Sequence, residues 1–454
     1  MLVVVLFMVH DGTRRCTIVT IAIAYGRSGM DISIPDELEP VVLRAKQQAA
    51  LSDPVAAVRD AVREPIGASS LGEAARAAIR EHGDERSGTC SVGIAFNDIS
   101  RATPNHIIIP VIIDELLAAG VRGGDITLFN ATGTHRSNST QELESILTPA
   151  LVRDYRIVQN DCTATDAHRE LGRTSRGNVV KVLDEFVGCD LRIATGFVEP
   201  HFFAGYSGGG KAVVPGLAHL DTILFNHGPA HMDHPDATWG KIHGNPLWED
   251  LAEAAAMADP TFLVNVAMNS DKDITAVFAG SRKDAHRVAC AHVAEHVMAP
   301  VDREFDVVIT SNSGHPLDLN LYQAVKGMSA AARVVRPGGT IIIAAECWDG
   351  IPEHGLFAEL IAGATSPDDL LATLRTEEYH VRDAWQAHIF ALIRSKAHIT
   401  LVSSGLGEDQ VPKALCEWAP SVESALESVR AGMDTVPSVC VLPDGPLTIP
   451  TVVG

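Results

Sequence analysis

The segment from residue 205 to residue 216 carries the densest group of residues that could do chemistry. It runs from Gly205 through three consecutive glycines to Lys211, a spacing that fits the phosphate-binding P-loop of nucleotide hydrolases. Ala212, however, has no hydroxyl to bind Mg²⁺, and Pro215 interrupts the helix that should follow. The sequence therefore disfavours a P-loop. It leaves either a tight turn with a solvated lysine or a loop that lets a bulky group approach the backbone.

Histidines surround this lysine in polar, loop-like segments. His201 precedes Lys211, and a group of four follows it, comprising His227, His231, His234 and His243. Such a group leaves open a three-histidine zinc site, as in a zinc-dependent hydrolase. Pro229 and Pro235 interrupt the helix that would place the first two on one face. We interpret most of the group as hydrogen-bonding, structural histidines.

Two residue pairs have a spacing suited to binding an anion. Asp98 and Arg101 follow a predicted strand, and Gln323 and Lys326 share one face of a predicted helix. Arginine and lysine in such positions can hold a substrate carboxylate. The alternatives are a helix N-cap with a surface ion pair, and a solvated helix face. Spacing alone leaves both alternatives open.

The elements that must position these residues alternate between strand and helix. Strands at 91–96 and 125–130 flank a helix at 107–119, and each strand ends in polar residues. The alternation continues with strands at 190–195, 307–310, 340–344, 398–403 and 438–442 and helices at 319–331 and 422–431. Such βαβ units predict parallel sheets with a site at their carboxyl edge. We therefore expect an α/β fold with two Rossmann-like domains.

The boundary between these domains is predicted near residues 299–304. We expect residues 16–302 to form an N-terminal α/β cofactor-binding domain and residues 303–431 a C-terminal α/β domain. The closing segment, 432–454, is expected to return to the N-terminal domain. Residues 1–15 begin with an apolar run too short to span a bilayer and without a basic n-region, so we interpret them as an N-terminal extension.

Composition narrows the class of partner. The net charge of −21 argues against a nucleic acid or an anionic membrane, because both are bound by basic surfaces, and favours a small solute. With 46% hydrophobic and 20% charged residues the chain can bury a large core. Eight cysteines without a CxxC motif indicate a reducing compartment, so we expect a cytoplasmic protein.

Taken together, these motifs resemble the lactate racemase family, whose members use a nickel-pincer nucleotide. The most specific match is the string Pro-His-x3-Gly-x-Ser-Gly-Gly-x-Lys-x3-Pro-Gly that begins at Pro200. Further matches occur in family order at residues 97–101, 131–135, 226–227 and 323–326 and at Trp385. The resemblance extends from about residue 16 to the C-terminus. Gly210 is a departure, because a larger basic residue can stand before the lysine.

The resemblance implies a racemase or epimerase that inverts C2 of a 2-hydroxy carboxylic acid, with lactate as the default. Lys211 would carry the pyridinium mononucleotide covalently, beside Ser207, Gly208 and Gly209, and His227 would complete a square-planar nickel site. The family pattern gives the catalytic role to His135 and His201. It gives substrate binding to Arg101, Gln323, Lys326, Trp385 and Asp98, of which Asp98 would orient Arg101 or the cofactor. The site would lie in the cleft between the domains.

The chemistry of such a substrate explains why two histidines are expected. The C2–H bond beside an ionised carboxylate is poorly acidic, so its hydrogen is more readily removed as hydride while a base takes the hydroxyl proton. The planar 2-keto acid can then receive hydride on either face, which requires a base for each orientation of the hydroxyl. The expected partners are the substrate and cofactor-maturation proteins, with no nucleic acid or membrane. The alternatives are a cofactor-free α/β ligand-binding protein and a zinc-dependent hydrolase.

Overall fold

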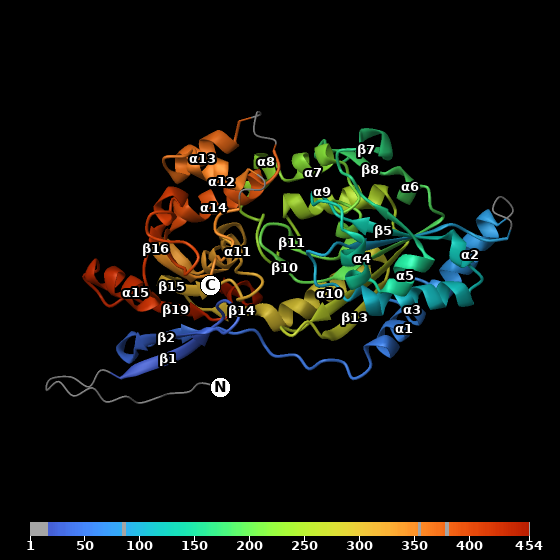
Figure 1. The fold of residues 1–454 in the computed structure, drawn as a ribbon. Helices are drawn as coiled ribbons and strands as arrows, with labels where there is room; N and C mark the ends of the chain where they lie inside the picture. Colours follow the sequence, from blue (N-terminus) through green and yellow to red (C-terminus); the bar gives the residue numbers. More distant parts are fainter. Residues whose placement is uncertain (1–16, 84–87, 353–355, 377–380, 454) are drawn as a thin grey trace. The chain divides into compact units, whose positions relative to one another are not determined.

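The computed structural model describes residues 17–83, 88–352, 356–376 and 381–453. The chain divides into two compact units (Figure 1). The N-terminal unit is Gln47–His296, and the C-terminal unit combines Met1–Lys46 with Val297–Gly454. The predicted N-terminal extension, residues 1–15, lies outside the described residues.

A six-stranded sheet forms the centre of the N-terminal unit. Its strand order is β13 (Ile274–Gly280), β12 (Phe262–Met268), β9 (Leu191–Phe197), β4 (Val92–Asn97), β5 (Ile126–Ala131) and β6 (Arg156–Gln159). All neighbours are parallel except β12 and β13. Two small antiparallel pairs accompany it, β7 (His168–Arg173) with β8 (Val179–Leu183) and β10 (Pro200–His201) with β11 (Gly205–Tyr206).

Several helices of the N-terminal unit begin at a side chain that caps them. Asp53 caps α1 (Pro54–Arg63), where its Oδ1 accepts a hydrogen bond from the Ala56 backbone at 2.9 Å, and Ser70 caps α2 (Leu71–His82) in a capping box. The others are α3 (Asn105–Ala118), α4 (Thr140–Ile146), α5 (Pro149–Asp154), α6 (Asp184–Val187), α7 (Leu220–Asn226), α8 (Pro229–Met232), α9 (Pro246–Met257) and α10 (Arg282–Val297).

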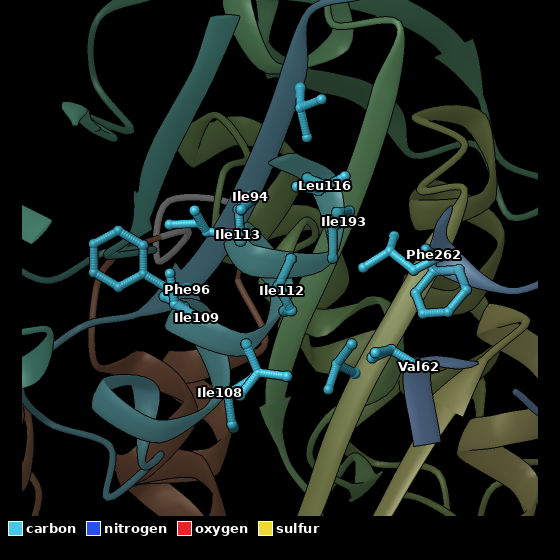
Figure 2. Close-up of a cluster of buried hydrophobic side chains, with 14 of the residues drawn as sticks. Val62, Ile94, Phe96, Ile108, Ile109, Ile112, Ile113, Leu116, Ile193 and Phe262 are labelled. Atoms are coloured by element: carbon cyan, nitrogen blue, oxygen red, sulfur yellow. The ribbon is translucent and has the colours of Figure 1, made fainter. Parts of the chain in front are cut away.

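The apolar side chains of α3 build the core of this unit. Figure 2 shows Ile109, Ile112 and Ile113 of α3 beside Ile94 of β4 and Ile193 of β9. All five are buried. The helix packs its apolar side chains on strands that are themselves apolar, as expected for a parallel sheet covered on both faces. This packing holds the carboxyl ends of the central strands in fixed positions.

The C-terminal unit contains a second six-stranded sheet, which is parallel throughout. Its order is β18 (Glu417–Trp418), β17 (His398–Val402), β16 (Val335–Ala344), β15 (Phe305–Ser311), β19 (Val439–Leu442) and β3 (Val41–Val42). The hairpin of β1 (Ile18–Ile23) and β2 (Met30–Pro35) and the parallel pair of β14 (Met298–Val301) and β20 (Ile449–Val452) complete its strands. Its helices are α11 (Leu321–Ala331), α12 (Phe357–Ala362), α13 (Pro367–Leu374), α14 (Ala384–Lys396) and α15 (Val422–Ala431).

The predicted α/β fold with parallel sheets is confirmed, but the predicted domain limits need correction at both ends of the chain. The closing segment stays in the C-terminal unit, where β19 lies between β15 and β3. The first strands also belong there: β3 pairs with β19, and alternate residues of the hairpin, such as Ile21 and Ile32, join the core of the C-terminal sheet. The free edge of β19 is the partner of β3, and an open apolar face is the partner of the hairpin. The order of elements along the sequence does not indicate either pairing.

None of the helices in the described part of the chain combines the length and the apolar character that crossing a bilayer requires.

Candidate active site

The predicted site residues of the N-terminal unit follow three neighbouring strands. Asp98 and Arg101 come after β4, His135 comes after β5, and His201 comes after β9. Because β9, β4 and β5 are adjacent and parallel, their carboxyl ends lie at one edge of the sheet. The residues predicted for this unit therefore follow strands that end at the same edge.

His135 is hydrogen bonded to Asp98. The imidazole Nδ1 lies 2.9 Å from the Asp98 carboxylate, whose other oxygen accepts a hydrogen bond from the Ser100 hydroxyl at 2.8 Å. Burial alone would raise the pKa of Asp98, but the hydrogen bond and charge of His135, with Ser100 and Arg101, bring it below its ordinary value. The ionised carboxylate therefore holds a proton on Nδ1 of His135 and leaves the lone pair on Nε2.

His201 has the opposite hydrogen-bond polarity. It lies in the tight β10–β11 hairpin, where its Nδ1 accepts a hydrogen bond from the Ala204 backbone N–H at 3.2 Å. An accepting Nδ1 leaves the proton of the neutral ring on Nε2. The ring packs edge to face against Phe203, with centroids 4.5 Å apart.

The glycine loop is tied down by side chains from the sheet. Asn265 of β12 accepts a hydrogen bond from the Gly209 N–H at 2.7 Å, and the Ser207 hydroxyl donates to the Phe197 carbonyl at 2.9 Å. Gly208 has φ +74°, and a Cβ there would lie 2.7 Å from Asn265 Oδ1, so only glycine fits. After the loop comes the short 3-10 turn Gly209–Ala212, and the next α-helix begins at Leu220. This geometry differs from that of a P-loop, in which the glycines lead directly into an α-helix.

Lys211 is half-buried at the end of this loop. Burial, with the positive charge of Arg101 nearby, lowers the pKa of Lys211 to about 7, although the Glu199 carboxylate acts in the opposite direction. A large fraction of this amine is therefore neutral and nucleophilic near neutral pH. Arg101 interacts electrostatically with both Lys211 and Asp98, so the three residues lie near one another.

His227 follows the last turn of α7. Its Nδ1 lies 3.1 Å from the Ile223 carbonyl oxygen, to which it donates a hydrogen bond, so the lone pair of the neutral ring is on Nε2. Burial and the charge of Lys211 lower the pKa of His227 to about 3. Phe203 contacts His227 at 5.2 Å as well as His201, so one aromatic ring links the two imidazoles. A neutral imidazole with an oriented Nε2 is a suitable metal ligand.

A buried polar network that the sequence reasoning missed fixes the end of α7. The carboxylate of Asp250 is completely buried and accepts hydrogen bonds from Thr174 at 2.6 Å and from Asn178 and Asn226 at 2.8 Å each. Asn226 directly precedes His227. The network therefore anchors the backbone that carries this histidine. In the sequence, the only indication of this network was the Asn226-His227 pair that follows an apolar helix.

The four-histidine group does not form a metal site by itself. Across the described residues, no three His, Cys, Asp or Glu side chains are placed to hold a metal ion together. His231 instead bonds through Nδ1 to the Asn226 carbonyl at 2.9 Å, and His234 accepts a hydrogen bond from the Asp236 backbone at 3.2 Å. This arrangement gives no support to the zinc hydrolase alternative.

The remaining predicted residues lie in the C-terminal unit. Gln323 and Lys326 are on α11, whose first turn is capped by Asn320, and Trp385 is in the first turn of α14. The starts of these two helices are joined, because the Tyr322 hydroxyl donates to Asp383 at 3.0 Å. Gln323 and Trp385 thus lie in the first turns of two linked helices, and Lys326 lies one turn further along α11.

Comparison with known proteins gives two successive family matches. The lactate racemase N-terminal domain matches residues 25–240, and the lactate racemase C-terminal domain matches residues 301–449. The lactate racemase of Thermoanaerobacterium thermosaccharolyticum is 32% identical over 431 residues, which cover 94% of this chain and 97% of that protein. The chain belongs to the lactate racemase family. The resemblance inferred from the sequence motifs is confirmed.

Other members of the lactate racemase family agree with this assignment. The lactate racemase of Lactiplantibacillus plantarum is 34% identical over 390 residues, or 86% of this chain and 89% of that protein. The solved structure of the lactate racemase apoprotein from T. thermosaccharolyticum has a TM-score of 0.88 at 31% identity and covers 95% of this chain and 100% of that one. The predicted enzyme class, an isomerase of the racemase type, is confirmed.

The two-unit fold extends beyond close lactate racemase relatives. A crystal structure of a Thermotoga maritima protein has a TM-score of 0.61 and 17% identity, and covers 86% of this chain and 100% of that one. At this identity the likeness concerns the fold alone.

Proposed function

We propose that this protein racemises lactate, or a closely related 2-hydroxy acid, by reversible hydride removal from C2. The proposal includes a nickel-pincer nucleotide that is attached covalently to Lys211 and ligated by His227. Family membership supports the reaction, and one solved relative is described as an apoprotein, a term for a protein without its cofactor. The observation that carries the proposal is the half-buried Lys211 amine, which feels the charges of Arg101 and Glu199 and follows a loop where only glycine fits at position 208.

The residues of this chain fit such a group. Lys211 offers an amine that is neutral near pH 7, and His227 offers an oriented Nε2. Among the described residues, no three His, Cys, Asp or Glu side chains are placed to hold a metal together, and the pincer would supply the ligands beside His227. When bound, the nucleotide supplies an acceptor that takes hydride from C2 and returns it.

The two histidines would divide the proton transfers. The Nε2 lone pair of His135 can take the substrate hydroxyl proton, with Asp98 stabilising the charged ring that results. The Nε2–H of His201 can return a proton to the oxygen of the 2-keto acid. In the reverse direction the two rings exchange roles. Both enantiomers are therefore served, because their hydroxyl groups point to different sides when the carboxylate is fixed.

The carboxylate would be fixed by cations. We assign it to Arg101, an exposed guanidinium beside Asp98, with Gln323 and Lys326 as further ligands and Trp385 packing near the substrate. Ser207, Gly208 and Gly209 would lie along the cofactor. The seven cysteines in the described part of the chain are buried, and the sequence has no CxxC motif, so we assign the protein to a reducing compartment such as the cytoplasm. Cofactor-maturation proteins are the further partners that we propose.

A chiral assay tests the proposal. The chain co-expressed with the maturation proteins is incubated with L-lactate or D-lactate, and the enantiomer ratio is followed with time. We expect both reactions to reach a racemic mixture. Lys211→Ala should abolish the conversion, whereas Lys272→Ala, in the turn before β13, should not change it. A panel of other 2-hydroxy acids defines the substrate range. No conversion of any of them by matured protein would contradict the proposal.

A further inference from the structure

A buried histidine beside the glycine loop is not used by the proposed chemistry. His286, in the second turn of α10, is only 4% exposed. Its Nε2 lies 2.9 Å from the Ser207 carbonyl oxygen, to which the ring donates a hydrogen bond. A polar ring that is buried this deeply is costly unless it is hydrogen bonded. The imidazole therefore links α10 to the first residue of the Ser-Gly-Gly-Gly-Lys segment.

The same ring also packs against the backbone of Gly209. A Cβ on Gly209 would lie 2.9 Å from Cγ and 3.0 Å from both Cδ2 and Nδ1 of His286, so the imidazole occupies the space that a side chain would need. Gly208 and Gly209 have φ values of +74° and +60°, in the left-handed region that favours glycine. His286 thus contacts the loop on both sides of Gly208, through a hydrogen bond at Ser207 and through packing at Gly209.

A second side chain holds the loop from the sheet. Asn265 of β12 accepts a hydrogen bond from the Gly209 N–H at 2.7 Å, whereas His286 donates to the Ser207 carbonyl. The backbone N–H of Lys211 in turn donates to the Gly208 carbonyl at 3.1 Å. The backbone that these two side chains hold therefore leads directly into the lysine, and a shift of the loop would move Lys211 with it.

The His286 ring has a defined charge and tautomer. Burial, with the positive charge of Lys211, lowers the pKa of His286 to about 4, although the hydrogen bond to Ser207 acts in the opposite direction. The neutral ring donates from Nε2 and has its lone pair on Nδ1, which lies 3.8 Å from the Cys290 sulfur. Burial raises the pKa of the Cys290 thiol to about 12, so the thiol keeps its proton. Trp248 of α9 lies nearly parallel to the imidazole, at 8° and with ring centroids 6.2 Å apart.

We propose that His286 is a positioning residue for the reaction, whose hydrogen bond to Ser207 and contact with Gly209 hold the glycine loop in the conformation that places the Lys211 amine. The inference rests on the proposed function, because it takes Lys211 as the point of attachment. His286 acts through the loop, and the role requires no contact with substrate or cofactor.

Loss of the His286 contacts should change the chemistry of the Lys211 amine. The pKa of this amine is about 7 because the amine is buried and the positive charge of Arg101 acts on it. A loop that is no longer held would expose the amine to water and change its distance from Arg101. Lys211 would then approach an ordinary lysine, which is protonated at neutral pH and is a poor nucleophile.

The pH dependence of Lys211 modification by an amine-reactive reagent tests this role on the full-length protein without cofactor. We expect the midpoint to rise by roughly one pH unit or more in His286→Leu, because leucine cannot donate to the Ser207 carbonyl. His286→Gln should restore the wild-type midpoint, because the glutamine Nε2 can reach the same carbonyl. His292→Leu is the matched control. It removes a histidine of the same helix that is hydrogen bonded to Gln48 at 3.0 Å, and it should leave the midpoint unchanged.

The matured protein provides a second measurement. In His286→Leu co-expressed with the maturation proteins, we expect kcat for lactate racemisation to fall about tenfold while KM changes by less than about twofold. The reason is that the residues assigned to the substrate carboxylate are not altered. His286→Gln should recover most of the lost kcat, which a loss of packing alone would not explain.

Several results would overturn the positioning role. One is a wild-type midpoint in His286→Leu, even if its thermal unfolding shows lower stability, because His286 would then be structural only. Another is an equal shift in His286→Gln and His286→Leu. If His286→Leu does not fold, His286→Asn replaces it: its amide is too short to reach Ser207, so an unchanged midpoint there would have the same meaning.

Failure of the positioning role can be distinguished from failure of the proposed function. The mass of the Lys211 peptide is measured in matured wild-type protein as a separate experiment. A shifted midpoint in His286→Leu together with an unmodified Lys211 in the matured wild type would refute the proposed function and leave the positioning role intact. A modified Lys211 together with an unshifted midpoint would do the reverse.

Discussion

The imidazole Nδ1 of His135 is 2.9 Å from the carboxylate of Asp98, a residue that is only 4% exposed. The His135 side chain is 47% exposed. A buried acid thus orients a ring that is itself accessible, and the accessible nitrogen is the one that lacks a proton. This is the polarity that a general base requires.

Replacing Asp98 with Asn should slow catalysis much more than it weakens substrate binding. The amide cannot stabilise a positively charged His135 ring, and its NH2 group favours the wrong tautomer. We expect kcat to fall roughly 100-fold with a small change in KM, as measured in the chiral assay with lactate. Asp114→Asn, on the surface of α3, is the control. An unchanged kcat in Asp98→Asn would refute the role of His135 as an oriented base.

The amine of Lys211 should react at neutral pH. Its pKa of about 7 means that the nucleophilic, neutral form predominates above that pH, whereas an ordinary lysine requires a pH above about 10. Protein without cofactor is treated with an amine-reactive reagent between pH 5 and 10, and modification of the Lys211 peptide is quantified by mass spectrometry. We expect a midpoint near 7. Replacing Arg101 with Met should move this midpoint upward, because its positive charge lowers the pKa. A midpoint near 10 in the wild type would refute the prediction.

Replacing Lys211 with Met should stabilise the protein without cofactor at neutral and acidic pH. The pKa is about 7 in the folded chain and 10.5 in the unfolded one, so the unfolded state binds more protons between these values. Wild-type stability therefore rises with pH across that window, and the penalty for burying the charge is complete below it. Denaturant unfolding should show an advantage of roughly 1 to 3 kcal/mol for Lys211→Met at pH 6 that shrinks towards pH 10. A constant difference across pH would argue against the lowered pKa.

Asp250 should be essential for stability and for the position of His227. Replacing it with Ala leaves Thr174, Asn178 and Asn226 without their shared acceptor. We expect the free energy of unfolding to fall by about 2 to 4 kcal/mol. Nickel content after co-expression should fall as well, and Asp250→Asn should be intermediate. Asp221→Ala, at an exposed position of α7, is the comparison. Equal stability of the two Ala variants would show that the network is dispensable.

The sequence predicted the regular part of this fold because its signals are local. Strands such as Val92–Asn97 and Ile126–Ala131 are continuous apolar runs that end in polar residues, and parallel strands bring those ends to one edge of a sheet. The partner of Val41–Val42 could not be predicted, because a two-residue strand has no pattern of its own. It forms only where β19 offers a free edge.

The site was predicted as a set of residues and not as a set of contacts. The Pro-His and glycine-lysine string identified His201 and Lys211, but nothing in it indicated that Nδ1 of His201 accepts a hydrogen bond from Ala204. The pairing of Asp98 with His135 joins residues 37 positions apart. Such relationships depend on packing between elements, which sequence spacing does not specify.

The central claim is that Lys211 is the attachment point of the cofactor, and mass spectrometry of the matured protein tests it most directly. Protein co-expressed with the maturation factors is digested, the peptide that contains Lys211 is sequenced, and the metal content of the intact chain is measured. We predict a mononucleotide-sized mass increase on Lys211, nickel close to one per chain, and loss of both in Lys211→Ala. An unmodified Lys211 in a preparation that racemises lactate would contradict this claim.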